Sequence, residues 1–107
     1  MSNFRELKVW RKSLDFSVTI YKTTESFPKQ EIYGLTSQMR RAAVSIVSNI
    51  AEGAGRNSNR DFLRFLAIAK GSAYELETQL IISHKLAFVN DSEAKILQGE
   101  LVEIQKM

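Results

Sequence analysis

Residues 59–87, NRDFLRFLAIAKGSAYELETQLIISHKLA, decide the fold class of this 107-residue chain. Apolar side chains recur there in alternating steps of three and four residues, at Phe62, Leu66, Ala69, Ala73, Leu76 and Leu80. This spacing is typical of a helix that packs against other helices along one seam. Ser58 stands just before the segment, and Asp61 three residues later completes a helix-start signal. The stretch therefore predicts one long amphipathic helix.

The same helical period runs through three other segments, residues 6–26, 31–52 and 92–106. Helix-breaking residues separate the segments. Pro28 lacks the N–H that a helix interior needs, Gly53 to Asn59 holds two glycines and cap-type residues, and Asn90 is an N-cap with Glu93 three residues on. We therefore expect a single domain over residues 1–107, an all-α, antiparallel, up-down-up-down four-helix bundle.

The first segment carries two apolar stripes. Leu7, Trp10, Leu14, Val18 and Tyr21 share one face, and Val9, Phe16, Ile20 and Phe27 share a neighbouring one. One interpretation is that the second stripe serves self-association, which makes Val9, Phe16 and Ile20 the expected oligomer interface. The other is that this helix lies across two others in the core and needs both stripes.

The residue types exclude most catalytic and metal sites. The chain has no cysteine and one histidine, His84, and Glu75 and Glu77 are two residues apart, which puts them on different sides of a helix. The Gly53-Ala-Gly55 sequence lacks the downstream Lys-Ser/Thr of a phosphate loop. We expect no enzyme activity, no metal and no cofactor. No long apolar run or signal peptide is present, so we expect a cytoplasmic protein without a membrane partner.

Positive charge is concentrated in the first two thirds of the chain. Residues 1–70 hold 12 Lys and Arg against 6 Asp and Glu, whereas residues 71–107 hold 3 against 6. The candidate nucleic-acid-binding residues are five arginines of the second and third predicted helices and the loop between them: Arg40, Arg41, Arg56, Arg60 and Arg64. Arginines beside a helix N-terminus suit phosphate groups. The alternatives are a solvated face and ion pairs between subunits.

Several motifs resemble one known family. These are Leu7-Lys8-Val9-Trp10, the stretch from Tyr33 to Ile46, Ser48 to Gly53 with Gly55-Arg56, Phe62 to Leu66 with Gly71-Ser72, and Glu75 to Leu80. The chain resembles, over nearly its whole length, the four-helix-bundle proteins encoded in intervening sequences of bacterial 23S ribosomal RNA genes. It departs from their pattern at Val47, where proline is common, and in a shorter C-terminal helix.

The resemblance implies a left-handed antiparallel bundle that assembles as a ring-like homopentamer, with no enzymatic activity attached to the family. The family is also similar to the accessory variability proteins of diversity-generating retroelements, which are basic pentamers thought to bind nucleic acid and a reverse transcriptase. Its motif residues fall here on Ser48, Asn49, Glu52, Gly53 and Gly55, beside Arg56. We interpret them as a polar network that fixes the turn, in which Glu52 pairs with Arg56 or Arg41.

Two hypotheses of function follow. In the first, a basic oligomer contacts the phosphates of structured RNA or DNA without reading base edges. In the second, the protein is an interaction scaffold whose arginines contact other subunits or a partner protein. The two differ in salt dependence, because contacts to phosphates release counterions.

Overall fold

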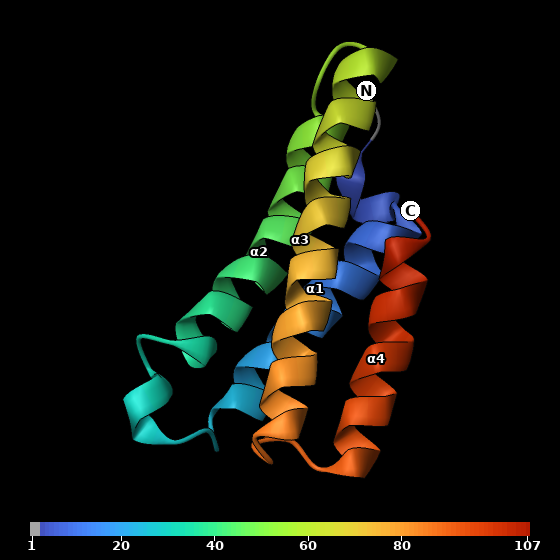
Figure 1. Ribbon diagram of the computed structural model, residues 1–107. Coiled ribbons are helices and arrows are strands. Elements are labelled where there is room, and N and C mark those ends of the chain that lie inside the picture. The colour runs from blue at the N-terminus through green and yellow to red at the C-terminus, as the bar shows by residue number, and fades with distance from the viewer. Residues whose placement is uncertain (1–2) are drawn as a thin grey trace.

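The computed structural model describes residues 3–107, which form a four-helix bundle (Figure 1). The helices are α1 (Lys8–Thr24), α2 (Leu35–Ala54), α3 (Asn59–Lys85) and α4 (Asp91–Gln105). Short 3-10 helices, η1 (Phe4–Glu6) and η2 (Lys29–Glu31), precede α1 and α2. Successive α-helices run in opposite directions, as the sequence predicts, and the described residues contain no strand. Within residues 3–107, no helix has the length and apolarity needed to cross a membrane.

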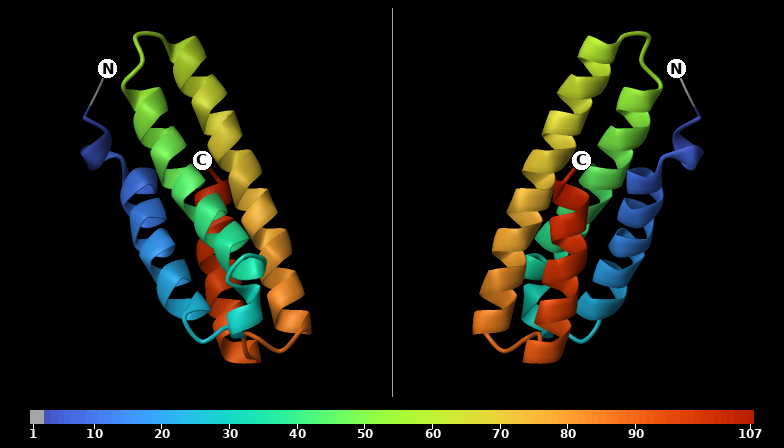
Figure 2. Two further views of the ribbon diagram at one scale, coloured as in Figure 1. Left: turned by 90° about the vertical axis from the view of Figure 1, so that its left-hand side faces the viewer. Right: turned by 90° about the vertical axis from the view of Figure 1, so that its right-hand side faces the viewer.

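The central pair of helices extends beyond the rest of the bundle. α2 and α3 form the most extensive helix contact, α1 packs on α2, and α4 packs on α3 (Figure 2). α4 has 15 residues against 27 in α3. Its end is fixed where Gln105 Nε2 donates to Glu77 Oε1, 2.8 Å away. The α2–α3 turn therefore projects beyond the end of α4.

The predicted seam of α3 forms the core. Ala69, Ala73, Leu76 and Leu80 are buried against apolar side chains of the other helices, among them Met39, Ile46, Ile50, Leu97, Leu101 and Ile104. The two seam residues nearest the start of α3, Phe62 and Leu66, are only half-buried. The reason is the length of α4, which ends beside Glu77, about four turns from Phe62.

The structure contradicts two of the three residues predicted for an oligomer interface on α1, Phe16 and Ile20. Phe16 and Ile20 are 2% and 0% exposed in the core of the single chain, and Val9 is half-buried and packs against that core. The surface stripe is the other one, where Leu14, Val18 and Tyr21 are 39%, 48% and 44% exposed.

Buried hydroxyl residues explain why the two stripes could not be told apart. Ser13, Ser17 and Thr24 share the buried face of α1 with Phe16 and Ile20, although hydroxyl residues are mostly exposed in proteins. Ser17 and Thr24 are accommodated because each hydroxyl donates to a backbone carbonyl of its own helix, at 2.8 Å. The core face is thus more polar than the exposed stripe.

Both predicted N-caps are confirmed. Ser58 Oγ accepts from the N–H of Asp61 at 3.1 Å, and Asn90 Oδ1 accepts from the N–H of Glu93 at 2.8 Å. Each cap satisfies a backbone donor that has no partner within the helix. The second predicted segment starts later than expected, because η2 and a turn precede α2 at Leu35.

Glu103 links α4 to α1 and also pairs with a lysine at the end of its own helix. Glu103 accepts a hydrogen bond from Lys106 Nζ at 2.8 Å and pairs with Lys12 Nζ at 3.5 Å. The hydrogen bond and charge of Lys106, and then the charge of Lys12, hold the pKa of the Glu103 carboxyl below its usual value. The lowered pKa stabilises the folded state at pH values above the ordinary pKa of a glutamate. This stabilisation is lost as the pH falls through the lowered pKa.

Replacing Ala87 with glycine should stabilise the protein. Ala87 ends α3 with a φ of 65°, the left-handed region, and its N–H and that of Phe88 donate to the carbonyls of His84 and Ser83. A side chain in this conformation costs about 1–2 kcal/mol, partly offset by the entropy that glycine loses, so we expect a gain of about 0.5–1 kcal/mol in urea denaturation. Ala67→Gly, on an exposed position inside α3, is the control and should lower stability by about 1 kcal/mol. Equal losses in the two variants would contradict the left-handed strain.

Candidate nucleic-acid interface

Three of the five candidate arginines gather at the projecting end of the α2–α3 hairpin. Arg56 lies in the loop after α2, and Arg60 and Arg64 are one turn apart at the start of α3. We call these three residues the basic tip. The Ser58 cap fixes where α3 begins and hence the direction in which Arg60 and Arg64 leave the helix.

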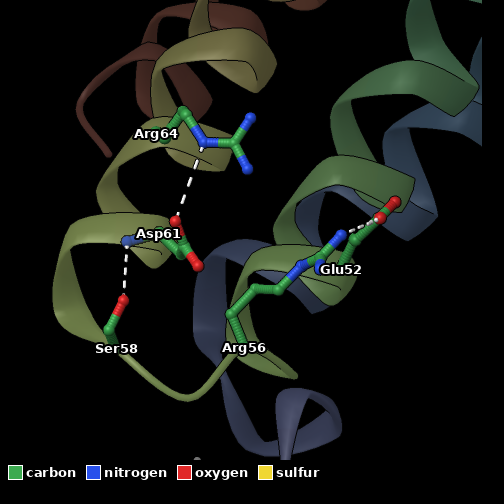
Figure 3. A network of polar contacts seen from close by, with 5 residues as sticks. All are labelled: Glu52, Arg56, Ser58, Asp61 and Arg64. Carbon is green, nitrogen blue, oxygen red and sulfur yellow. Dashed lines mark hydrogen bonds and ion pairs between the residues drawn. The ribbon is translucent and has the colours of Figure 1, made fainter.

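Carboxylates and one aromatic ring hold two of these arginines. Arg56 pairs with Glu52 at 2.7 Å, and Arg64 Nε lies 3.8 Å from Asp61 Oδ1. The guanidinium carbons of Arg56 and Arg64 lie 4.8 and 4.6 Å from the centroid of the Phe65 ring. Figure 3 shows Arg64 on α3 pointing toward Glu52 of α2 and Arg56 of the following loop. Both guanidinium groups thus lie against the same ring.

Arg60 is the least constrained member of the basic tip. Its side chain is exposed and makes no hydrogen bond or ion pair with any residue in the described range 3–107. A guanidinium carries five N–H donors, so Arg60 can offer all of them to an anion. The position also lies in the first turn of α3, where the backbone N–H groups favour negative charge.

The other two candidate arginines lie elsewhere. Arg40 lies 14 positions before the end of α2, about 21 Å along the helix axis from Ala54, which the loop of Arg56 follows. Its Nε donates to Thr24 Oγ1 at 2.9 Å, and its guanidinium lies 4.7 Å from the centroid of the Tyr21 ring. Arg40 therefore ties α2 to the end of α1. Arg41 is exposed in a polar groove between α2 and α3, beside Glu75.

Two arginines that sequence reasoning missed lie at the same end of the molecule as the basic tip. Arg5 in η1 and Arg11 in the first turn of α1 are exposed, and Arg11 Nη1 donates to the Arg5 carbonyl at 3.4 Å. η1 contacts α2, and because α1 and α2 are antiparallel the N-terminal segment lies beside the C-terminal half of α2 (Figure 2). The antiparallel pairing of the first two helices, which the sequence predicts, already places the start of the first helix beside the end of the second. It could therefore have indicated Arg5 and Arg11.

The only histidine has a structural contact. His84 Nε2 lies 2.6 Å from Asp91 Oδ1 and joins the end of α3 to the start of α4. In the described part of the chain, no three His, Asp or Glu side chains are grouped as metal ligands.

Comparison with known proteins assigns the chain to a family. The family model described as "23S rRNA-intervening sequence protein" matches residues 5–107. The chain belongs to this family. The chain is similar, at 30% identity, to the solved structure of a protein of unknown function from the S23 ribosomal protein family of Bacteroides thetaiotaomicron. The likeness has a TM-score of 0.82 and covers 92% of each chain. No curated protein sequence matches this chain.

One motif residue, Asn49, contributes to a polar link between α2 and α3. Asn49 Nδ2 donates to the Ser45 carbonyl at 2.8 Å and lies 3.1 Å from Ser45 Oγ. Ser45 Oγ in turn is 2.9 Å from Ser72 Oγ of α3. Ser48 is exposed and takes no part in this chain of contacts. The arrangement is a polar link between the two helices, within α2 and before the turn, and Asn49 is the motif residue that takes part in it.

The end of the motif shapes the hairpin turn. Glu52 pairs with Arg56, as one of the two predicted pairings has it, and the cation compensates a negative charge at the C-terminus of α2. Gly53 is buried where a Cβ atom would come within 2.7 Å of Phe65 Cβ. Gly55 has right-handed backbone, φ −82°, and an added Cβ would make only ordinary contacts. Val47, at the position where the family often has proline, lies inside the continuous helix α2.

Proposed function

We propose that this member of the 23S rRNA-intervening sequence protein family is a non-enzymatic oligomer of the cytoplasm that binds structured RNA or DNA through phosphate contacts. The basic tip carries the proposal. It places Arg56, Arg60 and Arg64 on a projecting turn, and the exposed arginines Arg5 and Arg11 lie at the same end of the molecule. A concentration of arginine at one end attracts a polyanion.

The environment of the basic tip favours contacts to the sugar-phosphate backbone over reading of bases. Stacking of bases needs an exposed aromatic ring. The ring nearest to these arginines, Phe65, is only 8% exposed and lies under the two guanidiniums. Guanidinium groups match phosphate oxygens with paired donors, so affinity is expected to depend on charge and shape.

The direct test is fluorescence-anisotropy binding to a labelled structured RNA and to a DNA duplex, titrated with salt. Arg60→Glu should weaken binding about tenfold or more, because one charge-assisted contact is replaced by repulsion. It should also lower the slope of log affinity against log salt by about one. Arg60 is suited to the test because no described residue depends on its side chain.

Lys29→Glu is the matched control. It makes the same change of charge at an exposed residue of η2, at the opposite end of the bundle from the basic tip (Figure 1). We expect it to leave affinity nearly unchanged. Equal losses in both variants would indicate a general effect of net charge, and no binding of the unmodified protein at low salt would overturn the proposal in favour of a protein partner.

We infer self-association from a separate surface. The apolar face of α1 and α2, defined by Leu14, Val18, Tyr21 and Val44, leaves each of these side chains 39–48% exposed. Several exposed apolar side chains on neighbouring helices of a small protein favour a contact with another molecule. A second copy of the chain is the occupant that the family resemblance favours. The same face supports the alternative role as a scaffold for a partner protein.

A further inference from the structure

One buried ring connects the two halves of the basic tip. Phe65 comes from α3, whereas Arg56 comes from the loop after α2, and both Arg56 and Arg64 lie with their guanidinium carbons within 5 Å of its centroid. A cation over the face of an aromatic ring is attracted by the negative face of the π system. The ring therefore offsets part of the repulsion between two like charges.

The backbone fixes this ring in place. Phe65 is 8% exposed and its Cβ lies close against Gly53 of α2, where an alanine Cβ would be only 2.7 Å away. The contact sets the distance between α2 and α3 at the tip. Side chains held by packing keep their geometry better than side chains on a loose surface.

Most hydrogen-bond donors of the two arginines remain free for a ligand. Arg56 uses one terminal nitrogen for Glu52, at 2.7 Å. Arg64 is 3.8 Å from Asp61, which is an ion pair but longer than a hydrogen bond. Because each guanidinium has five N–H donors, both retain the paired donors that bind phosphate oxygens. The carboxylates and the ring orient the groups without saturating them.

We propose that Phe65 is a positioning residue that holds Arg56 and Arg64 as a preformed pair for neighbouring phosphate groups of one nucleic-acid strand. The inference rests on the proposed function for its ligand. Phe65 is buried and uncharged, and it would nevertheless affect the affinity for nucleic acid through the two arginines. Ordering the two long side chains before binding removes part of the entropy cost of association.

The test compares Phe65→Leu with Phe62→Leu in the anisotropy assay. Phe62 is a half-buried aromatic residue of the same helical turn, and neither Arg56 nor Arg64 lies over its ring. Phe65→Leu should weaken binding about three- to tenfold, since two cation–π contacts are lost. The salt slope should stay unchanged because all charges remain. Phe65→Tyr keeps an aromatic ring and should bind as tightly as the unmodified protein. Phe62→Leu should have little effect on affinity.

A second measurement needs no ligand and separates the two proposals. In the free protein, the Nε–H resonances of Arg56 and Arg64 should be shifted by the ring current of Phe65, and Phe65→Leu should remove both shifts. Arg64→Lys keeps the charge and leaves Phe65 in place, and it should also weaken binding without changing the slope.

The outcomes are distinct for each proposal. Unshifted arginine resonances, or binding by Phe65→Leu equal to that of the unmodified protein, would overturn the positioning role alone. If the resonances are shifted but no nucleic acid binds at low salt, the proposed function fails and the role of Phe65 in affinity fails with it. Should Phe65→Leu unfold at the assay temperature, the free unmodified protein decides, because arginine Nε–H resonances without a ring-current shift would overturn the positioning role.

Discussion

Replacing Gly53 with alanine is expected to destabilise the bundle by about 1–3 kcal/mol, the usual cost of adding a methyl group to a packed interior. The added Cβ would lie 2.7 Å from Phe65 Cβ, 3.1 Å from Phe62 Cδ1 and 3.3 Å from the Phe62 carbonyl oxygen. Phe65 Cβ and the Phe62 carbonyl cannot turn away, because neither is the end of a flexible side chain. The clash can be relieved only if α2 and α3 move apart at the tip.

Gly71→Ala is the matched control for this prediction. Gly71 is exposed inside α3, and an added Cβ would have nothing within 4 Å. Alanine has the higher helix propensity, so this variant should gain up to about 1 kcal/mol. Urea denaturation of both variants gives the comparison. A Gly53→Ala variant as stable as Gly71→Ala would show that α2 and α3 do not need the close approach.

The close approach at Gly53 also connects the family motif to the candidate site. Phe65, which α2 meets at Gly53, is the ring on which Arg56 and Arg64 lie. Moving the helices apart would displace the ring from at least one arginine. The motif glycine therefore sets the geometry of the basic tip without contacting a ligand itself.

The fold could be predicted because local signals agreed with one another. The three-four spacing from Phe62 to Leu80 and the caps at Ser58 and Asn90 each indicate the same helices. Local consistency of this kind is what makes a sequence specify one fold. The orientation of α1 could not be predicted, because its exposed stripe of Leu14, Val18 and Tyr21 is more apolar than its buried face, which carries three hydroxyl residues.

The candidate site was predictable only in part. Arg56, Arg60 and Arg64 lie near one another in the sequence and come together across a single turn. Arg40 was grouped with them by residue type, but its place on α2 puts it against α1, where it bonds Thr24. The contact of Arg56 with Phe65 joins a loop to a helix face, and no periodicity within one helix can indicate such a contact.

Introducing glutamate at both Leu14 and Val18 should dissociate the protein into single chains, measured by light scattering coupled to size exclusion. The two residues are one turn apart on the exposed stripe of α1, 39% and 48% exposed, so the free chain can carry the charges in water. In an assembly the same positions would bury two unpaired carboxylates in an apolar contact, which costs several kcal/mol for each charge. The circular-dichroism spectrum should stay that of a folded helical bundle.

Ala67→Glu with Thr78→Glu is the control, because it adds the same charge at two exposed positions of α3. It should keep the mass of the assembly. A glutamate pair on α1 that leaves the mass of the assembly unchanged would exclude the apolar face of α1 and α2 as the contact between copies. If the unmodified protein is already a single chain, that face remains open to a protein partner, and self-association is excluded.

Dissociation with unchanged binding per chain would show that the basic tip acts within one chain, whereas a loss of affinity on dissociation would show that several tips bind one nucleic acid together.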